Sequence, residues 1–232
     1  MSGTGGGSLD GDLDNGVITH EYTHGISNRF TGGPGNTSCL QNAEQGGEGW
    51  SDYVGLMLTT NWASATLSDG PIARGIGTYV QGQPANGGGI RTKPYSTNFA
   101  VNNLTYADMG TGAIGTEVHN IGEIWCMAVW EMTWAIIQQE GTINPNLYNF
   151  TPTTAGGNSI ALKLVLEGMR LQPCSPGYID ARDAILSADR NLYAGRHACA
   201  IWTAFAKRGM GFGASQGSSF SATDQTASTT MP

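Results

Sequence analysis

The chain has 232 residues and is 39% hydrophobic, so it can fold around one sizeable core or two small ones. Only 12% of the residues are charged, and the net charge of -7 with no basic cluster argues against nucleic acid or an anionic membrane as a partner. The longest apolar stretch, around residues 121–137, is interrupted by Glu123 and Glu131, so we expect no membrane-spanning segment.

The first half of the chain predicts two helices followed by an irregular region. Residues 1–13 are rich in Gly and Ser and are expected to be loose, and then Asp14 or Asn15 caps a helix that ends at "TGGPGN", residues 31–36. A second helix is predicted from about residue 41 to 62, although three glycines weaken its first turns. Residues 63–115 are dense in Gly, Pro, Asn and Thr, with strand-like pieces such as "GTYV", and predict loops and hairpins.

The second half predicts a mainly helical core. Apolar residues recur every three or four positions between 119 and 139, which is typical of a buried helix face. They are Ile121, Ile124, Trp125, Ala128, Val129, Met132 and Ile136. Further helices are predicted near 157–172, 178–190 and 196–208, and the Gly-, Ser- and Thr-rich tail from residue 209 onward is expected to be frayed.

The stretch "LDGDLDNGVITHEYTHG", residues 9–25, has two competing interpretations as a metal site. In the first, Asp10, Asp12, Asp14 and Glu21 have the spacing of positions one, three, five and twelve of a calcium-binding loop. The sixth position of such a loop is normally Gly, which allows a sharp turn, but here it is Asn15. The presence of calcium near the three aspartates is left open, and the pattern does not support it.

The second interpretation treats "HEYTH", residues 20–24, as helical and binding zinc. His20 and His24 then project from one face and can share a tetrahedral ion. Glu21 stands beside that ion without binding it, where it can take a proton from water activated by the zinc. This role suits the single glutamate better than the calcium role, so we favour zinc. A polar helix face without a metal is the alternative.

A second acidic motif, "GEGWSD" at residues 47–52, strengthens the zinc interpretation. Glu48 can complete a His-His-Glu site, and Asp52, one helical turn on, can accept a hydrogen bond from the far nitrogen of a zinc-bound histidine. Glu44 is a rival third ligand, but it lacks a companion acid at the right offset. A three-histidine site needs a third His six residues after His24, and that position is Phe30.

Five segments together resemble one known family. "HEYTHGISNRFTGGPGN", "GEGWSDY", "GIRTKPYS", "EVHNIGEIW" and "LQPCSPGYIDARDAIL" are similar to the fungalysin family of secreted zinc metalloendopeptidases, relatives of thermolysin with a His-His-Glu zinc site. The resemblance implies a mainly α fold, the helical zinc-bearing lobe of a thermolysin-like peptidase, with an irregular, hairpin-containing middle and little β-sheet. It also implies a secreted, extracellular protein with a loose N-terminus over 1–13, a catalytic domain over 14–214 and a Gly/Ser/Thr-rich tail over 215–232.

The resemblance implies roles for individual residues as well. One zinc ion per chain would be bound by His20, His24 and Glu48, with Glu21 as general base and Asp52 as the hydrogen-bond partner of a ligand. Such a site hydrolyses peptide bonds: the zinc activates water and polarises the carbonyl, and the general base accepts the water proton and later delivers it to the leaving amine. The substrate would be an extended polypeptide in a cleft between two lobes.

Thermolysin-like enzymes also use a downstream histidine and an arginine. His119 in "EVHNIGE" would donate to the developing oxyanion, and Arg91 in "GIRTKPYS" would bind the substrate carbonyl. The alternatives are that His119 only caps the helix that follows it and that Arg91 pairs with a nearby acid. The related enzymes often use a tyrosine as a further oxyanion donor, for which Tyr95 and Tyr106 are candidates, but we favour packed, hydrogen-bonded tyrosines because neither lies in a motif that aligns. His197 is interpreted as structural.

The four cysteines fit no CxxC pattern and therefore favour disulfides formed in an oxidising compartment. Cys174 and Cys199 bracket one predicted helix, so we pair them, which leaves Cys39 with Cys126. The start of the chain lacks the features of a signal peptide, so we expect a secreted protein to have lost its leader.

The upstream part of the chain departs from the family pattern. Only 19 residues precede His20, whereas thermolysin-like enzymes have a large β-rich lobe there and fungalysins also carry a propeptide. The chain is expected to be a fragment, to work with a separate lobe or to have lost that lobe. The alternative function is a non-catalytic, zinc-stabilised helical module, or the inactive half of a peptidase. A structural zinc site normally has four protein ligands, whereas this set has three and an adjacent glutamate, which favours an enzyme.

Overall fold

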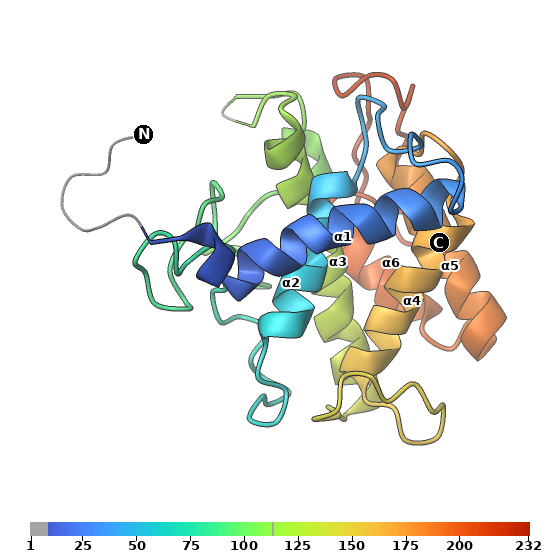
Figure 1. Cartoon of the computed structure of the whole chain (residues 1–232). Coiled ribbons are helices and arrows are strands. Elements are labelled where there is room, and N and C mark those ends of the chain that lie inside the picture. Colours follow the sequence, from blue (N-terminus) through green and yellow to red (C-terminus); the bar gives the residue numbers. More distant parts are fainter. Residues whose placement is uncertain (1–8, 113) are drawn as a thin grey trace.

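The chain is mainly helical in a computed structural model that describes residues 9–112 and 114–232 (Figure 1). Its α-helices are α1 (Asn15–Gly32), α2 (Gly47–Thr59), α3 (Val118–Glu140), α4 (Gly157–Leu171), α5 (Tyr178–Tyr193) and α6 (Ala198–Lys207), and short 3₁₀ helices cover Gly11–Leu13 and Tyr106–Asp108. Over the described residues the only strand-like pairs are isolated bridges, such as Arg74 with Tyr95. The predicted helical fold with little sheet is confirmed, whereas "GTYV", residues 77–80, forms no strand.

Helix α3 forms the centre of the core. Its middle is buried on every side, as expected of a helix that is apolar all round, and helices α2, α4 and α6 pack against it (Figure 1). Its buried acids, Glu123 and Glu131, are both hydrogen-bonded, as a buried carboxylate requires. The helix predicted from apolar periodicity over 119–139 is therefore confirmed.

Helix α1 begins and ends where the sequence predicts. One oxygen of the Asp14 carboxylate accepts hydrogen bonds from the backbone N–H groups of Gly16 and Val17, which caps the helix. The other oxygen accepts from the N–H groups of Tyr79 and Val80 and so fastens the irregular region to the start of α1. The helix ends at Gly33, whose positive φ of 78° favours glycine.

Helix α2 is shorter than predicted. It covers Gly47–Thr59, so the prediction of helix over 41–46 is wrong. That stretch is a loop tied to the C-terminal tail, because the N–H of Glu44 and the side-chain amide of Asn42 both donate to the carbonyl of Ser219. Two glycines then let α2 and α3 touch through their backbones: a Cβ at Gly49 would lie 2.5 Å from the carbonyl oxygen of Gly122.

The disulfide joins Cys39 to Cys174, and both predicted pairs are wrong. Helix α5 lies between Cys174 and Cys199, and its 16 residues extend for about 24 Å, much further than a disulfide can reach. Cys126 is a buried free thiol in the middle of α3, and Cys199 is an exposed free thiol. The observed bond ties the loop after α1 to the loop after α4.

The C-terminal tail is held in place, so the expectation of a frayed end is wrong. Bridges join Met210 to Ser228 and Ser215 to Thr226, and the side chain of Gln225 donates to the carbonyl of Met109. In the described part of the chain, no helix combines the length and the hydrophobicity that crossing a membrane needs.

Candidate metal centre

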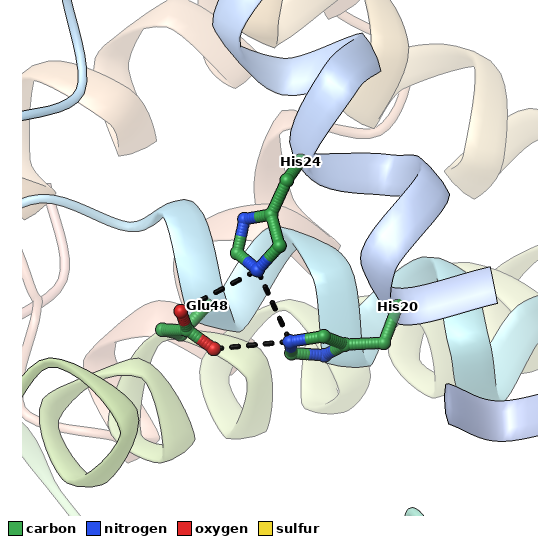
Figure 2. Close-up of side chains that lie close together, drawn as sticks. All are labelled: His20, His24 and Glu48. Carbon is green, nitrogen blue, oxygen red and sulfur yellow. Dashed lines mark hydrogen bonds and ion pairs between the residues drawn. The ribbon is translucent and has the colours of Figure 1, made fainter. Parts of the chain in front are cut away.

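Two neighbouring helices bring three side chains to one point. Helix α1 presents His20 and His24 from successive turns of one face, and α2 presents Glu48 from its first turn (Figure 2). The two Nε2 atoms are 3.2 Å apart. Glu48 Oε2 lies 3.0 Å from Nε2 of His20, and Glu48 Oε1 lies 3.4 Å from Nε2 of His24. Among the described residues this is the one group of its kind that could hold a metal ion.

The spacing of these atoms fits a zinc ion. Ligand atoms bound tetrahedrally at about 2.1 Å from zinc lie about 3.4 Å from one another. The two Nε2 atoms are 3.2 Å apart, and they lie 3.0 and 3.4 Å from the two different oxygens of the Glu48 carboxylate, all close to that value. Imidazole nitrogens with a carboxylate are donors that zinc accepts, and three protein ligands leave one tetrahedral position for water or substrate.

Asp52 holds His20 in the orientation that a metal needs. Its Oδ1 lies 2.7 Å from Nδ1 of His20, and the carboxylate also accepts from Nε and Nη2 of Arg91 at 2.7 and 2.8 Å and from the hydroxyl of Tyr95. Burial acts to raise the pKa of Asp52, but Arg91 and His20 outweigh it and hold that pKa below its usual range. Because Nδ1 of His20 donates to Asp52, the neutral ring presents its lone pair at Nε2, the nitrogen that faces Glu48 and His24.

The acid–base properties of the metal-free ligands show what zinc must displace. Burial lowers the pKa of His20, but its hydrogen bonds with Asp52 and Glu48 outweigh this and raise it to about 9. Burial lowers the pKa of His24, whereas the two histidines hold the pKa of Glu48 below its usual range against the effect of its own burial. Binding of a metal must therefore release the proton of His20.

Glu21 is exposed on α1, next to His20. Its charge acts to raise the pKa of His24, one turn further along the same helix. Within the described residues it has no hydrogen bond or ion pair that would commit it elsewhere. This arrangement leaves Glu21 free to exchange protons with a molecule bound at the centre.

His119 stands at the start of α3, on the other side of the centre. Its Nε2 is 3.5 Å from Oε2 of Glu48, and its Nδ1 is 2.6 Å from Oε1 of Glu117. Glu117, not His119, caps α3, because its carboxylate accepts from the N–H groups of His119 and Asn120. Glu117 was not predicted from the sequence, although an acid two residues before a candidate histidine is a recognisable signal.

Arg91 pairs with an acid, as one of its two interpretations proposed. Its side chain is only 6% exposed and grips Asp52 through two nitrogens, with Nη2 also 3.5 Å from Oε2 of Glu48. Over the described residues its Nη1 has no hydrogen bond. Contact of Arg91 with substrate remains a prediction.

The other candidates of the sequence analysis have separate partners. Glu44 is fully buried and accepts from the hydroxyl of Tyr106 and the N–H of Tyr178, so it is not the third ligand. Tyr95 is packed and bonded to Asp52. His197 is buried between Asp189 and Glu140, outside the metal centre.

Two histidines of one helix and a glutamate of the next meet at one point, and a second glutamate stands beside the first histidine. This arrangement is typical of a metallopeptidase with one metal ion. The chain belongs to the fungalysin metallopeptidase family, whose profile matches residues 6–214.

Curated relatives agree with this family. The chain is 41% identical over 230 residues to an extracellular metalloproteinase, mep, of Aspergillus fumigatus, which covers 96% of this chain and 33% of the relative. It is 44% identical over 215 residues to extracellular metalloproteinase 4 of Arthroderma otae, covering 88% and 31%. It is 44% identical over 211 residues to extracellular metalloproteinase MEP of Pyricularia oryzae, a match that covers 88% of this chain and 31% of the relative. The chain thus spans about a third of the length of these relatives.

Proposed function

We propose that the chain binds one zinc ion through His20, His24 and Glu48 and hydrolyses peptide bonds of polypeptides outside the cell. The observation that carries this proposal is that His20, His24 and Glu48 each offer one ligand atom within 4.8 Å of the other two, with the two Nε2 atoms 3.2 Å apart and Nε2 of His20 3.0 Å from Oε2 of Glu48. Membership of the fungalysin metallopeptidase family supports the reaction. Relatives named extracellular metalloproteinases support the location.

Glu21 is the proposed general base. Zinc, when bound, makes a coordinated water more acidic and polarises the scissile carbonyl. Glu21 accepts the proton of the attacking water and then delivers it to the nitrogen of the leaving amine. Its exposure and its freedom from other partners fit a residue that must take up and release a proton in each cycle.

His119 is the proposed donor to the developing oxyanion of the scissile carbonyl. An imidazole that donates from Nδ1 to Glu117 presents a lone pair at Nε2 when it is neutral, and a hydrogen at Nε2 when it is protonated. The donor role therefore requires a hydrogen at Nε2. Glu117 also fixes the orientation of the ring towards the metal centre.

Arg91 is the proposed group that binds a substrate carbonyl next to the scissile bond. Asp52 fixes the guanidinium through Nε and Nη2, so Nη1 is the nitrogen left to donate. The part of the cleft upstream of α1 is proposed to come from the two thirds of the relatives' length that this chain does not span.

The variant Glu21→Gln tests the proposal. Gln has nearly the shape of Glu, and the substitution leaves the three proposed zinc ligands unchanged. We therefore expect unchanged zinc content and a rate of peptide hydrolysis that falls by about 10²–10⁴-fold. Glu167→Gln is the matched control, since that glutamate lies on α4 and, among the residues that the structure describes, pairs only with Arg170. Hydrolysis that survives in Glu21→Gln at full zinc content contradicts the assignment of the base. Zinc without hydrolysis in the unaltered chain contradicts the proposal that this chain alone is a peptidase.

A further inference from the structure

Glu123 is a buried carboxylate of α3 that serves a segment far from it in sequence. It is 1% exposed and lies one helical turn after His119, on the same face of α3. Both of its oxygens are used by one residue: Oε1 accepts from the backbone N–H of Thr92 at 2.8 Å, and Oε2 accepts from the Thr92 hydroxyl. Burial raises the pKa of Glu123, and the nearby charge of Arg91 opposes that rise.

Thr92 is the second residue of a short segment, residues 91–95, whose two end residues both bind Asp52 beside the metal centre. Arg91 grips Asp52 through two nitrogens, and the hydroxyl of Tyr95 donates to the same carboxylate. Asp52 in turn holds His20. The hydrogen bonds between Thr92 and Glu123 therefore link this segment directly to helix α3.

The hydrogen bonds between Thr92 and Glu123 matter because the region around Thr92 is irregular. Residues 63–115 contain one short 3₁₀ helix and no sheet in their described part, so side-chain hydrogen bonds add to the few long-range backbone bonds that fix their position. Helix α3 is a firm anchor, since a Cβ at Gly122 would lie 2.6 Å from Cβ of Glu48 and 2.9 Å from N of Gly49. Because Glu123 is next to Gly122, this close contact fixes the position of Glu123 relative to Glu48, the proposed third ligand.

We infer that Glu123 is a positioning residue for the proposed hydrolysis. Glu123 joins α3, which carries His119, to the segment that carries Arg91. It thereby fixes the positions of His119 and Arg91 relative to the three proposed ligands. The inference rests on the proposed function for its effect on catalysis. Its effect on the metal site, through Arg91, Asp52 and His20, can be measured without catalysis.

A second buried acid of the same helix provides the matched control. Glu131 is 7% exposed and bonds to Lys207 and Arg208, away from the metal centre. The variants are Glu123→Gln, Thr92→Val, their double variant and Glu131→Gln. Thr92 is exposed, so Thr92→Val removes one of the two hydrogen bonds and opens no cavity.

Three readouts are measured on the full chain: the zinc dissociation constant by chelator competition, the exchange rate of the Tyr95 amide, and kcat/KM on a peptide. The Tyr95 N–H donates to the carbonyl of Arg74 and does not touch Glu123, so its exchange reports on the whole segment. We expect Glu123→Gln to weaken zinc binding and to lower kcat/KM by about tenfold each, the lower end for partners of metal ligands, and to speed Tyr95 exchange. Thr92→Val shifts the same readouts less, and the double variant adds little to Glu123→Gln.

Glu131→Gln is expected to lower the melting temperature while leaving zinc affinity and kcat/KM unchanged. If Glu123→Gln behaves in the same way, with unaltered zinc affinity, Tyr95 exchange and kcat/KM at a temperature where it is folded, Glu123 is merely structural and the inference is overturned. If the unaltered chain hydrolyses no peptide, the proposed function fails. Zinc affinity and Tyr95 exchange then still decide whether Glu123 positions the segment.

Discussion

Replacement of the buried Glu44 by Gln should change how stability depends on pH. Glu44 is fully buried, and burial raises its pKa from 4.5 to about 7, although hydrogen bonds from Tyr106 and Tyr178 act to lower it. Between pH 4.5 and 7 the folded chain therefore holds a proton that the unfolded chain has lost. Stability falls as the pH rises through this window, because the folded state binds more protons than the unfolded state.

The size of the effect follows from the two pKa values. A difference from 4.5 to about 7, at about 1.4 kcal/mol per pH unit, corresponds to roughly 3 kcal/mol of unfolding free energy. The contribution is intact below pH 4.5 and absent above pH 7. Glu44→Gln is uncharged throughout and loses this dependence, while its amide oxygen can still accept from Tyr106 and Tyr178.

The assay is urea denaturation of both metal-free proteins at pH 4.5, 6 and 8, in the presence of a chelator. Other titrating groups, including His20, contribute equally to the two proteins, so they cancel in the difference. Relative to the unaltered chain, Glu44→Gln should gain about 3 kcal/mol between pH 4.5 and 8. A difference that stays constant over this range refutes the argument that Glu44 is buried as a protonated acid.

Three further outcomes follow from close contacts and cysteines. Gly122→Ala should destabilise the chain by about 1–3 kcal/mol in urea and weaken zinc binding, because its Cβ would lie 2.6 Å from Cβ of Glu48, a ligand; an unchanged zinc affinity contradicts the close contact. Cys39→Ser should cost about 2–5 kcal/mol, because the disulfide closes a loop of 135 residues; a melting temperature that does not fall argues against that bond. Thiol labelling of the native chain should modify the exposed Cys199 and leave the buried Cys126 unreacted until unfolding. Peptide mapping identifies the labelled cysteine, and a label on Cys126 in the native chain would contradict its burial.

The parts of the fold that depend on local sequence could be predicted. Helix α1 has Asp14 to cap it and Gly33 to end it, and α3 shows its apolar period directly, so both were placed to within about a residue or two. The ligand pattern is local as well, since His20 and His24 need only a helix to face the same way. These features are encoded within single segments of the chain.

The parts that depend on contacts between distant segments could not be predicted. The pairing of Cys39 with Cys174 is set by how two loops meet, over a separation of 135 residues. The order of the tail comes from backbone partners such as the bridge of Ser215 with Thr226. The roles of Glu117 and Glu123 follow from their contacts with His119 and Thr92, which only the structure shows. The candidate ligands and the role of Asp52 were thus visible in the sequence, whereas the roles of Glu117 and Glu123 required the structure.

The central claim is that one zinc ion is bound by His20, His24 and Glu48. Zinc bound per folded chain, measured by elemental mass spectrometry after dialysis, tests it most directly when the unaltered chain is compared with His24→Ala and with the control Glu167→Gln. The account predicts close to one zinc per chain in the unaltered protein and the control, and loss of that zinc in His24→Ala. Retention of zinc by a folded His24→Ala, or absence of zinc from the unaltered chain, would contradict the claim.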